Sequence, residues 1–322
     1  MAGAPDSNAA DSWHTGNRPQ PGDQGSQTHR ASGAVLVTGA TGNVGRTLVA
    51  ELLTAGEHVR AGVPDPAAAE LPTGVDVVRL DFGAAATAAP ALAGVDRLFL
   101  MRPPAISDVQ SALGPVIAAA AAAGVRRVVV LSVMGVNPAL PHWRMERMVR
   151  QAALPSTALR PAYFAQNLLT AFGDDLRRRS ELRLGAGNGK VSFVDARDVA
   201  AVAAAVLTQA ADPPAALTLT GPAALTFADA AALLTAELGR PIAYVRQGLL
   251  RHRRELLAAG AEPAYANVQL VIDLTTRLGL AQRVTSGVAD VLGRPATPLS
   301  QYIHDARDGW LWPPPPGRPS AP

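Results

Sequence analysis

Short apolar runs alternate with longer alanine-rich stretches from about residue 33 onward. Five runs predict buried strands, at 35–38, 59–63, 75–80, 98–101 and 128–131. They are apolar at nearly every position rather than at every second one, which is typical of a parallel sheet covered by helices on both faces. The pattern therefore predicts a doubly wound α/β fold with a parallel sheet.

The alternation loosens after about residue 162. A strand-like run at 217–220 is followed by Gly221 and Pro222, and helical patterns follow at 227–238 and 264–280. These features predict a smaller C-terminal α/β lobe that encloses the substrate. We expect a nucleotide-binding core at 33–162, to which 191–220 returns, and a lobe formed mainly by 163–310.

The ends of the chain differ in composition from the middle. Residues 1–32 are polar and lack the basic and apolar regions of a signal peptide, so they predict a disordered tail, and 311–322 predict a proline-rich tail. No run has the roughly 18 strongly apolar residues of a membrane span, and 117–125, mostly alanine, predicts a buried helix. We expect no membrane span and a cytoplasmic location.

Composition and charge narrow the possible functions. The chain has no cysteine, which excludes disulfides, thiol nucleophiles and cysteine-bound metals. A net charge of +3 in 322 residues is a small excess, and the arginine-rich runs at 177–179 and 251–254 lie beside acidic residues. Such runs are typical of solvated helix faces, so we expect no nucleic-acid partner.

A glycine-rich turn opens the predicted core in "AVLVTGATGNVGRTLVAELL" (34–53). Glycines after a strand and before a helix allow a tight turn, a close approach to a pyrophosphate and close helix packing. The helix N-terminus supplies free N–H groups and partial positive charge. The turn predicts a Rossmann-type dinucleotide site, with these cofactor-binding residues: Gly39, Thr41, Gly42, Asn43, Val44 and Gly45.

A second glycine-rich segment, at 185–191, is similar to a phosphate-binding P-loop but does not match its motif. The first required glycine is Leu184, and the required serine or threonine is Val191. We therefore expect no nucleotide site there.

Residues 38–45, "TGATGNVG", resemble the motif of the NmrA-like group of atypical short-chain dehydrogenases/reductases. The group includes redox-sensing regulators, triphenylmethane reductase and NAD(P)H quinone oxidoreductases. Further agreement comes from "LMRPPAISDV" (100–109), "VVVLSVMGV" (128–136), "LRPAYFAQNLL" (159–169), "VSFVDARDVAAVAAAVL" (191–207), "LTGPAALTFADAAALLTAELGRPI" (219–242) and "LGRPATPLSQYIHD" (292–305). The resemblance spans nearly all of 33–310. It implies an NAD or NADP cofactor, and we add Asp81, Phe82, Arg102 and Pro103 to the expected cofactor-binding residues.

The Tyr-x-x-x-Lys pair of better-known short-chain dehydrogenases is absent. Lys190 is the only lysine, and no tyrosine precedes it by four. At the corresponding place His142 and Glu146 are spaced i and i+4 on one predicted helix face. His142 is a candidate proton donor whose tautomer or charge Glu146 holds. The alternative is a helix-surface pair kept for packing.

Four further residues are candidates for the acceptor side. Ser132 follows the run 128–131 and could bind a substrate carbonyl or the nicotinamide, or could simply cap the strand. Tyr163 is a candidate proton donor, or an aromatic wall packed with Phe164 against the cofactor. The resemblance places Phe164 and Asn167 at the substrate pocket.

Other catalytic classes fit poorly, because there is no Gly-x-Ser-x-Gly segment and the histidines lack metal-ligand spacing. Two hypotheses remain. The chain reduces a small quinone, imine, enone or carbonyl acceptor, or it senses cofactor occupancy and binds a protein partner. We favour the reductase, because 160–169 and the C-terminal lobe are suited to enclosing a small molecule and no apolar or charged stripe in the sequence marks a partner surface.

Cofactor preference depends on "HVRAGVPDP" (58–66). NADP-binding members of the group commonly have an arginine that binds the 2′-phosphate at the place of Pro64. Asp65 could accept a ribose hydroxyl, or could only form a turn. Arg60 and Arg46 are alternative phosphate ligands. We expect a modest preference for NAD(H), with NADP(H) accepted.

Overall fold

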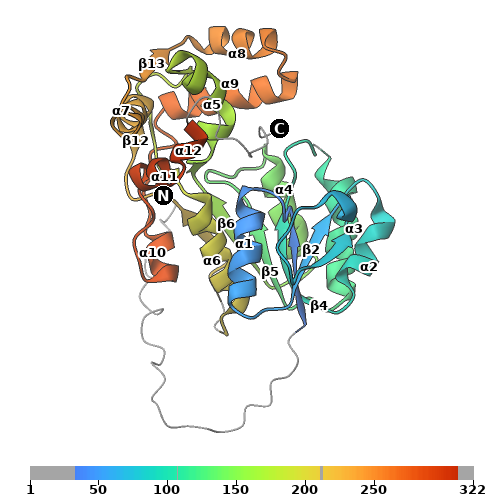
Figure 1. The fold of residues 1–322 in the computed structure, drawn as a ribbon. Helices are drawn as coiled ribbons and strands as arrows, with labels where there is room; N and C mark the ends of the chain where they lie inside the picture. Colours follow the sequence, from blue (N-terminus) through green and yellow to red (C-terminus); the bar gives the residue numbers. More distant parts are fainter. Residues whose placement is uncertain (1–32, 107, 211–212, 311–322) are drawn as a thin grey trace, which may run out of the picture. The chain divides into compact units, whose positions relative to one another are not determined.

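A computed structural model describes residues 33–106, 108–210 and 213–310. Seven strands form one parallel sheet in the order β11-β6-β5-β4-β1-β2-β3 (Figure 1). The strands are β1 Ala34–Thr38, β2 Val59–Val63, β3 Asp76–Arg79, β4 Val95–Met101, β5 Arg127–Leu131, β6 Ser156–Pro161 and β11 Ala216–Leu219. The order reverses between β1 and β4, which confirms the predicted doubly wound, Rossmann-type fold.

All five strands predicted in the core are present, and so is the strand predicted at 217–220, with small shifts in their ends. The largest shift is in β4, which begins at Val95 rather than at 98. The apolar pattern did not predict this start because Asp96 and Arg97, which are charged, interrupt it. Arg97 is buried at 5% exposure, and Glu57 neutralises it in an ion pair at 2.7 Å.

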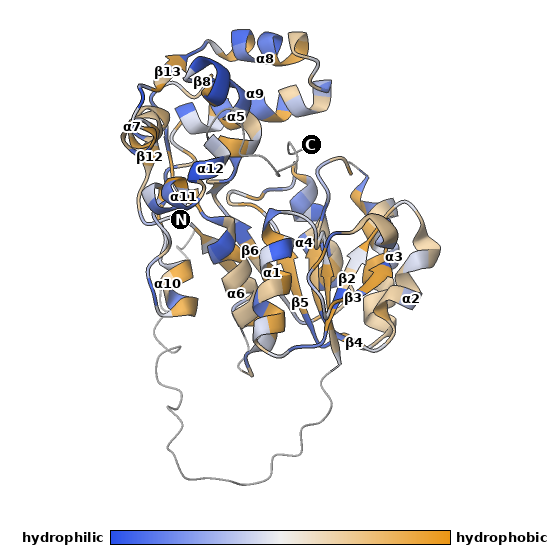
Figure 2. Ribbon diagram, viewed as in Figure 1, coloured by the Kyte–Doolittle hydropathy of each residue, from blue (hydrophilic) through white to orange (hydrophobic). Residues whose placement is uncertain are grey.

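Helices cover both faces of the sheet, and Figure 2 shows the central strands as mainly hydrophobic. One face carries α1 Asn43–Thr54, α6 Ala196–Thr208 and α10 Gly287–Leu292. The other carries α2 Ala88–Leu92, α3 Val109–Ala122 and α4 Pro141–Gln151. Successive strand residues point to opposite faces of the sheet and pack in two separate cores. Val35 and Val37 lie in the core beneath α1 and α6, which we call the α1–α6 core, and Leu36 lies in the core beneath α2, α3 and α4, which we call the α2–α4 core.

A third core lies in the C-terminal part of the described chain. Its rings include Tyr163, Phe193 and Phe227, which make mutual edge-to-face contacts at 5.4–5.8 Å between centroids. The elements here are β7 Tyr163–Phe164, α5 Asn167–Arg179, β8 Glu181–Leu184, β9 Lys190–Val191, β10 Phe193–Val194, β12 Leu225–Thr226, α7 Phe227–Leu238, β13 Ala243–Arg246, α8 Leu249–Ala258, α9 Pro263–Arg277, α11 Leu299–Asp305 and α12 Arg307–Trp310. Two short 3-10 turns, η1 Pro66–Ala68 and η2 Ala85–Thr87, lie in the first half.

The predicted helices are confirmed in kind. The helix predicted at 227–238 has those bounds in α7, and the one predicted at 264–280 runs over 263–277. The alanine run 117–125 begins inside α3 and passes beyond its end, and the expectation that it is buried is wrong in part, because residues 121–124 are exposed. The predicted tails at 1–32 and 311–322 lie outside the described residues.

An exposed apolar stripe gathers on α8, α9 and the segment after them, contrary to our expectation from the sequence. Its residues are Leu250, Tyr265, Val268, Val271, Leu274, Leu278, Leu280 and Val284. The buried face of α9 is formed by Ala266, Gln269, Asp273 and Thr276, so the larger apolar side chains of this helix lie on its exposed side. Among the described helices, none is both long enough and apolar enough to cross a membrane.

Candidate cofactor and acceptor site

The predicted site residues follow the carboxyl ends of five different strands. The glycines follow β1, Asp65 follows β2, Asp81 follows β3, Arg102 follows β4, and Ser132 follows β5. Because the strands are all parallel, these positions meet at one edge of the sheet. We call this edge the carboxyl edge.

The glycine turn is built for close backbone contacts. Gly39 has φ +63°, in the left-handed region, and an added Cβ would lie 2.7 Å from the Met101 side chain. At Gly45, an added Cβ would lie 2.1 Å from the Gly39 carbonyl oxygen, so α1 packs directly on the turn. Gly42 is different: its φ of −79° is ordinary, and the nearest atom to an added Cβ is 3.3 Å away.

The N-terminus of α1 offers free hydrogen-bond donors. Gly42 is the N-cap, with no side-chain cap, and the first turn holds no acidic residue. Within the described chain, the backbone N–H groups of 43–45 have no acceptor outside the helix. Thr41, Gly42 and Asn43 are exposed, whereas Val44 and Gly45 are buried. This turn therefore fits a pyrophosphate, which needs such donors and no β-carbon in its path.

The loops after β2 and β3 hold Asp65, the expected ribose residue, and Asp81 and Phe82, two further expected cofactor-binding residues. Asp65 Oδ1 accepts from the Ala67 N–H at 3.0 Å, which is the turn role we weighed, and Oδ2 has no partner in the described chain. Asp81 Oδ1 accepts from the Gly83 N–H at 2.8 Å, and the partly buried Phe82 packs against the α2–α4 core.

Arg60 is excluded as a phosphate ligand. Its Nε pairs with Asp76 at 2.7 Å, and its Nη1 donates to the carbonyls of Ala91 and Ala93. These partners lie at the amino ends of β3 and β4, opposite the carboxyl edge. Arg46, exposed in the first turn of α1, has no partner in the described chain.

Two buried polar atoms have no partner in the described chain: Nε of Arg102, in the loop after β4, and Nδ1 of His142, in the first turn of α4 after β5. The Nη1 of Arg102 donates to the carbonyls of Pro103, Pro104 and Ile106, so this side chain holds its own loop. Burial, and then the Arg102 charge, lower the pKa of His142 to about 4, against a smaller opposing effect of Glu146. His142 is therefore a neutral imidazole at neutral pH.

Glu146 does not orient His142 through a hydrogen bond, which corrects our expectation. Its buried carboxylate accepts from Ser132 Oγ at 2.6 Å, from Arg160 Nη2 at 2.7 Å and from Arg150 Nη1 at 3.4 Å. Burial raises the pKa of Glu146, but the hydrogen bonds from Arg160 and Ser132 outweigh burial and lower it below its ordinary value. Because the Ser132 hydroxyl donates its hydrogen bond to Glu146, it can only accept a hydrogen bond from a group at the carboxyl edge.

Tyr163 and Phe164 point to opposite sides, as successive strand residues do, so the aromatic wall that we considered does not form. Tyr163 packs in the third core, while Phe164 packs against the α1–α6 core. Burial first, and then Tyr265 and Asp273, raise the pKa of Tyr163, whereas Asn167 lowers it by hydrogen bonding. Tyr163 is therefore a protonated phenol without a cation to acidify it.

Several residues at or near this edge escaped the sequence analysis. Met101 and Met134 follow or end strands β4 and β5 and are half-buried against the same core as Phe164. Arg160 lies at the end of β6 and holds Glu146. Asp273 reaches Tyr163 electrostatically from α9 and pairs with the buried His252 at 2.5 Å. The only sequence signal for the two methionines is their position at or just after the end of a predicted strand. No local sequence feature identifies Asp273 as a neighbour of Tyr163.

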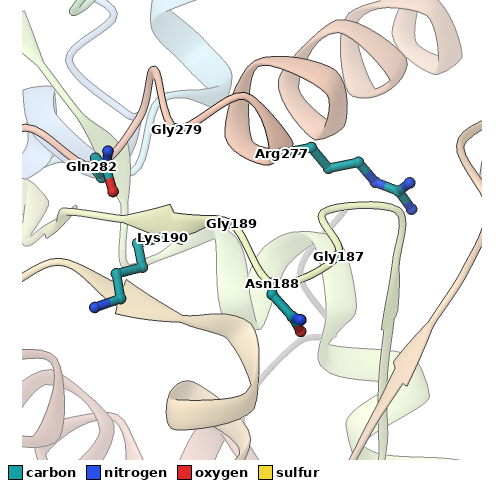
Figure 3. Close-up of a pocket in the computed structure, with 7 residues that line it drawn as sticks. All are labelled: Gly187, Asn188, Gly189, Lys190, Arg277, Gly279 and Gln282. Atoms are coloured by element: carbon teal, nitrogen blue, oxygen red, sulfur yellow. The ribbon is translucent and has the colours of Figure 1, made fainter.

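The rejected P-loop segment forms a turn beside a pocket of about 450 Å³ (Figure 3). Gly189 N–H donates to the Ala186 carbonyl, closing the turn. Arg277 donates to the carbonyls of Gly185 and Gln247, and Figure 3 shows its side chain pointing away from that of Lys190. The two cations do not converge, so the turn has no phosphate cradle.

Comparison with known proteins identifies the family to which these features belong. The family model described as the NmrA-like family matches residues 31–280. An NAD(P)H azoreductase of Xenophilus azovorans is 33% identical over 276 residues, covering 83% of this chain and 96% of the relative. A (4-alkanoyl-5-oxo-2,5-dihydrofuran-3-yl)methyl phosphate reductase of Streptomyces griseus is 36% identical over 277 residues, covering 83% and 96%.

A solved structure agrees over nearly the whole fold. The NADPH-dependent quinone oxidoreductase of Escherichia coli, in complex with NADPH, aligns with a TM-score of 0.76 and 25% identity. The alignment covers 85% of this chain and 99% of that protein.

Proposed function

The chain belongs to the NmrA-like family, and we propose that it reduces a small conjugated acceptor, such as a quinone, imine, enone, carbonyl or azo compound. It is an NAD(P)H-dependent oxidoreductase. Support for the acceptor class comes from the relatives, which are an azoreductase, a reductase of an unsaturated lactone and a quinone oxidoreductase.

One observation carries the placement of the chemistry: two buried polar atoms, Arg102 Nε and His142 Nδ1, have no partner in the described chain. Buried polar atoms without a partner cost about 1–3 kcal/mol each, so they point to a bound group that completes them. Both follow strands that end at the carboxyl edge, on the same edge as the glycine turn. We assign the pyrophosphate to the N–H groups of 43–45 and the nicotinamide end to the vicinity of Arg102 and His142.

The bound cofactor supplies a hydride, and the acceptor also takes up one proton. Addition of hydride to a conjugated acceptor leaves a delocalised anion, which needs only a weak proton donor. Neutral His142 and protonated Tyr163 are donors of this kind. The Ser132 hydroxyl donates its hydrogen to Glu146 and can otherwise only accept, so it suits the carboxamide N–H of the nicotinamide rather than an oxygen or nitrogen of the acceptor.

We propose a modest preference for NAD(H). Pro64 offers no charge to a 2′-phosphate, and Arg60 is held at the amino edge by Asp76. The free Oδ2 of Asp65 can accept a ribose hydroxyl and would repel a phosphate. Exposed Arg46 is the remaining cation on α1, so NADP(H) is still accepted.

The experiment is to mix purified protein with NADH or NADPH and a panel of quinones, imines, enones and azo dyes, and to follow the loss of reduced nicotinamide absorbance. Turnover of at least one conjugated acceptor is expected. Tight cofactor binding without turnover of any acceptor would contradict the proposal and favour a cofactor sensor.

Variants assign the proton donor. If His142 donates, His142→Gln lowers kcat by roughly a hundredfold with little change in cofactor affinity. Exposed His58 provides the matched control in His58→Gln, and Tyr302→Phe is the control for Tyr163→Phe. A loss confined to Tyr163→Phe assigns the role to the phenol, and no loss from either variant assigns proton delivery to solvent.

A further inference from the structure

A pocket of about 520 Å³ lies beside α4, over strands β6 and β11. It is on the sheet face that the α2–α4 core covers, because Val130 of that core lines it. Volumes of about 300–1,000 Å³ are typical of small-molecule sites. The pocket is not part of the cofactor and acceptor arrangement described above, although Glu146 lines it.

The floor of the pocket is made of small side chains. Ala158 of β6 and Ala216 of β11 are paired in register, and Ala215 lies next to them. Ala158 is 5% exposed yet belongs to none of the three apolar cores. On the opposite face of the same strands, Leu159 and Leu219 pack tightly in the α1–α6 core. The hollow exists because methyl groups stand where larger side chains would fill the space.

One end of the pocket carries a surplus of positive charge. Arg150 and Arg160 both line it, and both contact the single buried carboxylate of Glu146. Among the described residues, no other acidic side chain lines the pocket. Within the described chain, Nη1 of Arg160 and Nη2 of Arg150 have no hydrogen-bond partner. Two guanidinium groups facing one carboxylate leave a net positive charge and free N–H donors for an anion.

We propose that this pocket binds a small carboxylate with an apolar body. The carboxylate head accepts from Arg150 and Arg160, as guanidinium groups bind carboxylates through paired N–H donors. The apolar body lies on Ala158, Ala216 and Leu154. An inorganic anion would satisfy the arginines but leave the apolar floor uncovered, so the floor selects the organic acid.

Glu146 connects this pocket to the carboxyl edge. It accepts from Ser132 on one side and from the two arginines on the other, and its side chain is 2% exposed. The binding site that we propose therefore shares the Glu146 carboxylate with the carboxyl edge but no ligand-contacting atom with the cofactor site.

The test is isothermal titration calorimetry on the full chain with benzoate, the neutral isostere benzyl alcohol, and inorganic phosphate. Benzoate is expected to bind one to one with a Kd of roughly 0.1–1 mM, as for one paired contact and a buried ring. Benzyl alcohol and phosphate are each expected to bind at least tenfold more weakly. The same titration with the dinucleotide present is expected to give the same Kd.

Two variants locate the binding. Ala216→Leu fills the floor and Arg150→Gln removes one guanidinium, so each is expected to weaken benzoate binding at least fivefold. Arg147→Gln is the control, because Arg147 lies on the same helix but stacks on Trp143 and does not line the pocket. Melting temperatures confirm that each variant is folded.

No benzoate binding at about 10 mM would overturn the proposal, and so would unchanged binding in both folded variants. Phosphate that binds as tightly as benzoate would overturn the assignment of the apolar body. Because the readout is binding, these results do not depend on whether the chain reduces any acceptor.

Discussion

The same substitution at two glycines of the first turn should affect different properties: protein stability at Gly45 and cofactor affinity at Gly42. At Gly45 an added Cβ would lie 2.1 Å from the Gly39 carbonyl oxygen, where ordinary contact begins near 3.4 Å. Helix α1 would have to move by about 1 Å, and overpacking of this kind costs about 1–3 kcal/mol. Alanine also gains about 1 kcal/mol of helix propensity over glycine. We expect Gly45→Ala to lower the free energy of unfolding by up to about 2 kcal/mol, or Tm by up to roughly 8 °C.

At Gly42 the same methyl group meets only the Gly39 carbonyl, at 3.3 Å, and the backbone has an ordinary φ of −79°. Gly42→Ala should therefore change stability by less than about 1 kcal/mol. It should nevertheless weaken cofactor binding at least tenfold, or about 1.4 kcal/mol, because the methyl group obstructs the approach to the N–H groups of 43–45. Gly42→Val should abolish measurable binding.

The assay measures Tm by differential scanning fluorimetry and the Kd of NADH and NADPH by calorimetry on Gly42→Ala, Gly42→Val and Gly45→Ala. The expected pattern is a selective loss of affinity at Gly42 and a loss of stability at Gly45. Wild-type affinity in both Gly42 variants would refute the assignment of this turn to the pyrophosphate.

Three further predictions concern single side chains. Pro64→Arg should tighten NADPH by about tenfold through one charge-assisted contact, measured by calorimetry; wild-type protein that already strongly prefers NADPH would contradict it. Because the folded pKa of His142 lies below the unfolded value of 6.5, the unfolded chain binds more protons between pH 6.5 and 4. The free energy of unfolding should therefore fall by up to about 3 kcal/mol as the pH is lowered from 6.5 to 4, and His142→Gln should reduce this fall, measured by urea unfolding. The same pH dependence in His142→Gln as in the wild type would place the histidine in solvent. Glu146→Gln should destabilise the fold by about 3 kcal/mol by leaving Arg160 short of its counter-charge, and an unchanged unfolding midpoint would show that the pair is dispensable.

The sequence by itself determined the fold class and the position of the cofactor turn. Strand 59–63 and helix 227–238 were predicted with the bounds that the structure gives, because apolar periodicity and turn residues act locally. The glycine spacing fixed the turn for the same reason, since φ at Gly39 and the contact at Gly45 are set within a few residues of each other.

Only the tertiary structure decided the partners of the polar side chains. Spacing along α4 suggested that Glu146 serves His142, but the carboxylate lies beside Ser132 and Arg160, each 14 residues away in the sequence. Arg60 was a candidate phosphate ligand, but its side chain binds Asp76 and the carbonyls of Ala91 and Ala93 instead. A carboxylate pairs with whichever cation the packing of strands brings within reach, and that choice depends on contacts far apart in the chain. For the same reason, the net positive charge of the pocket beside α4 arises only when β6, β11 and α4 are assembled.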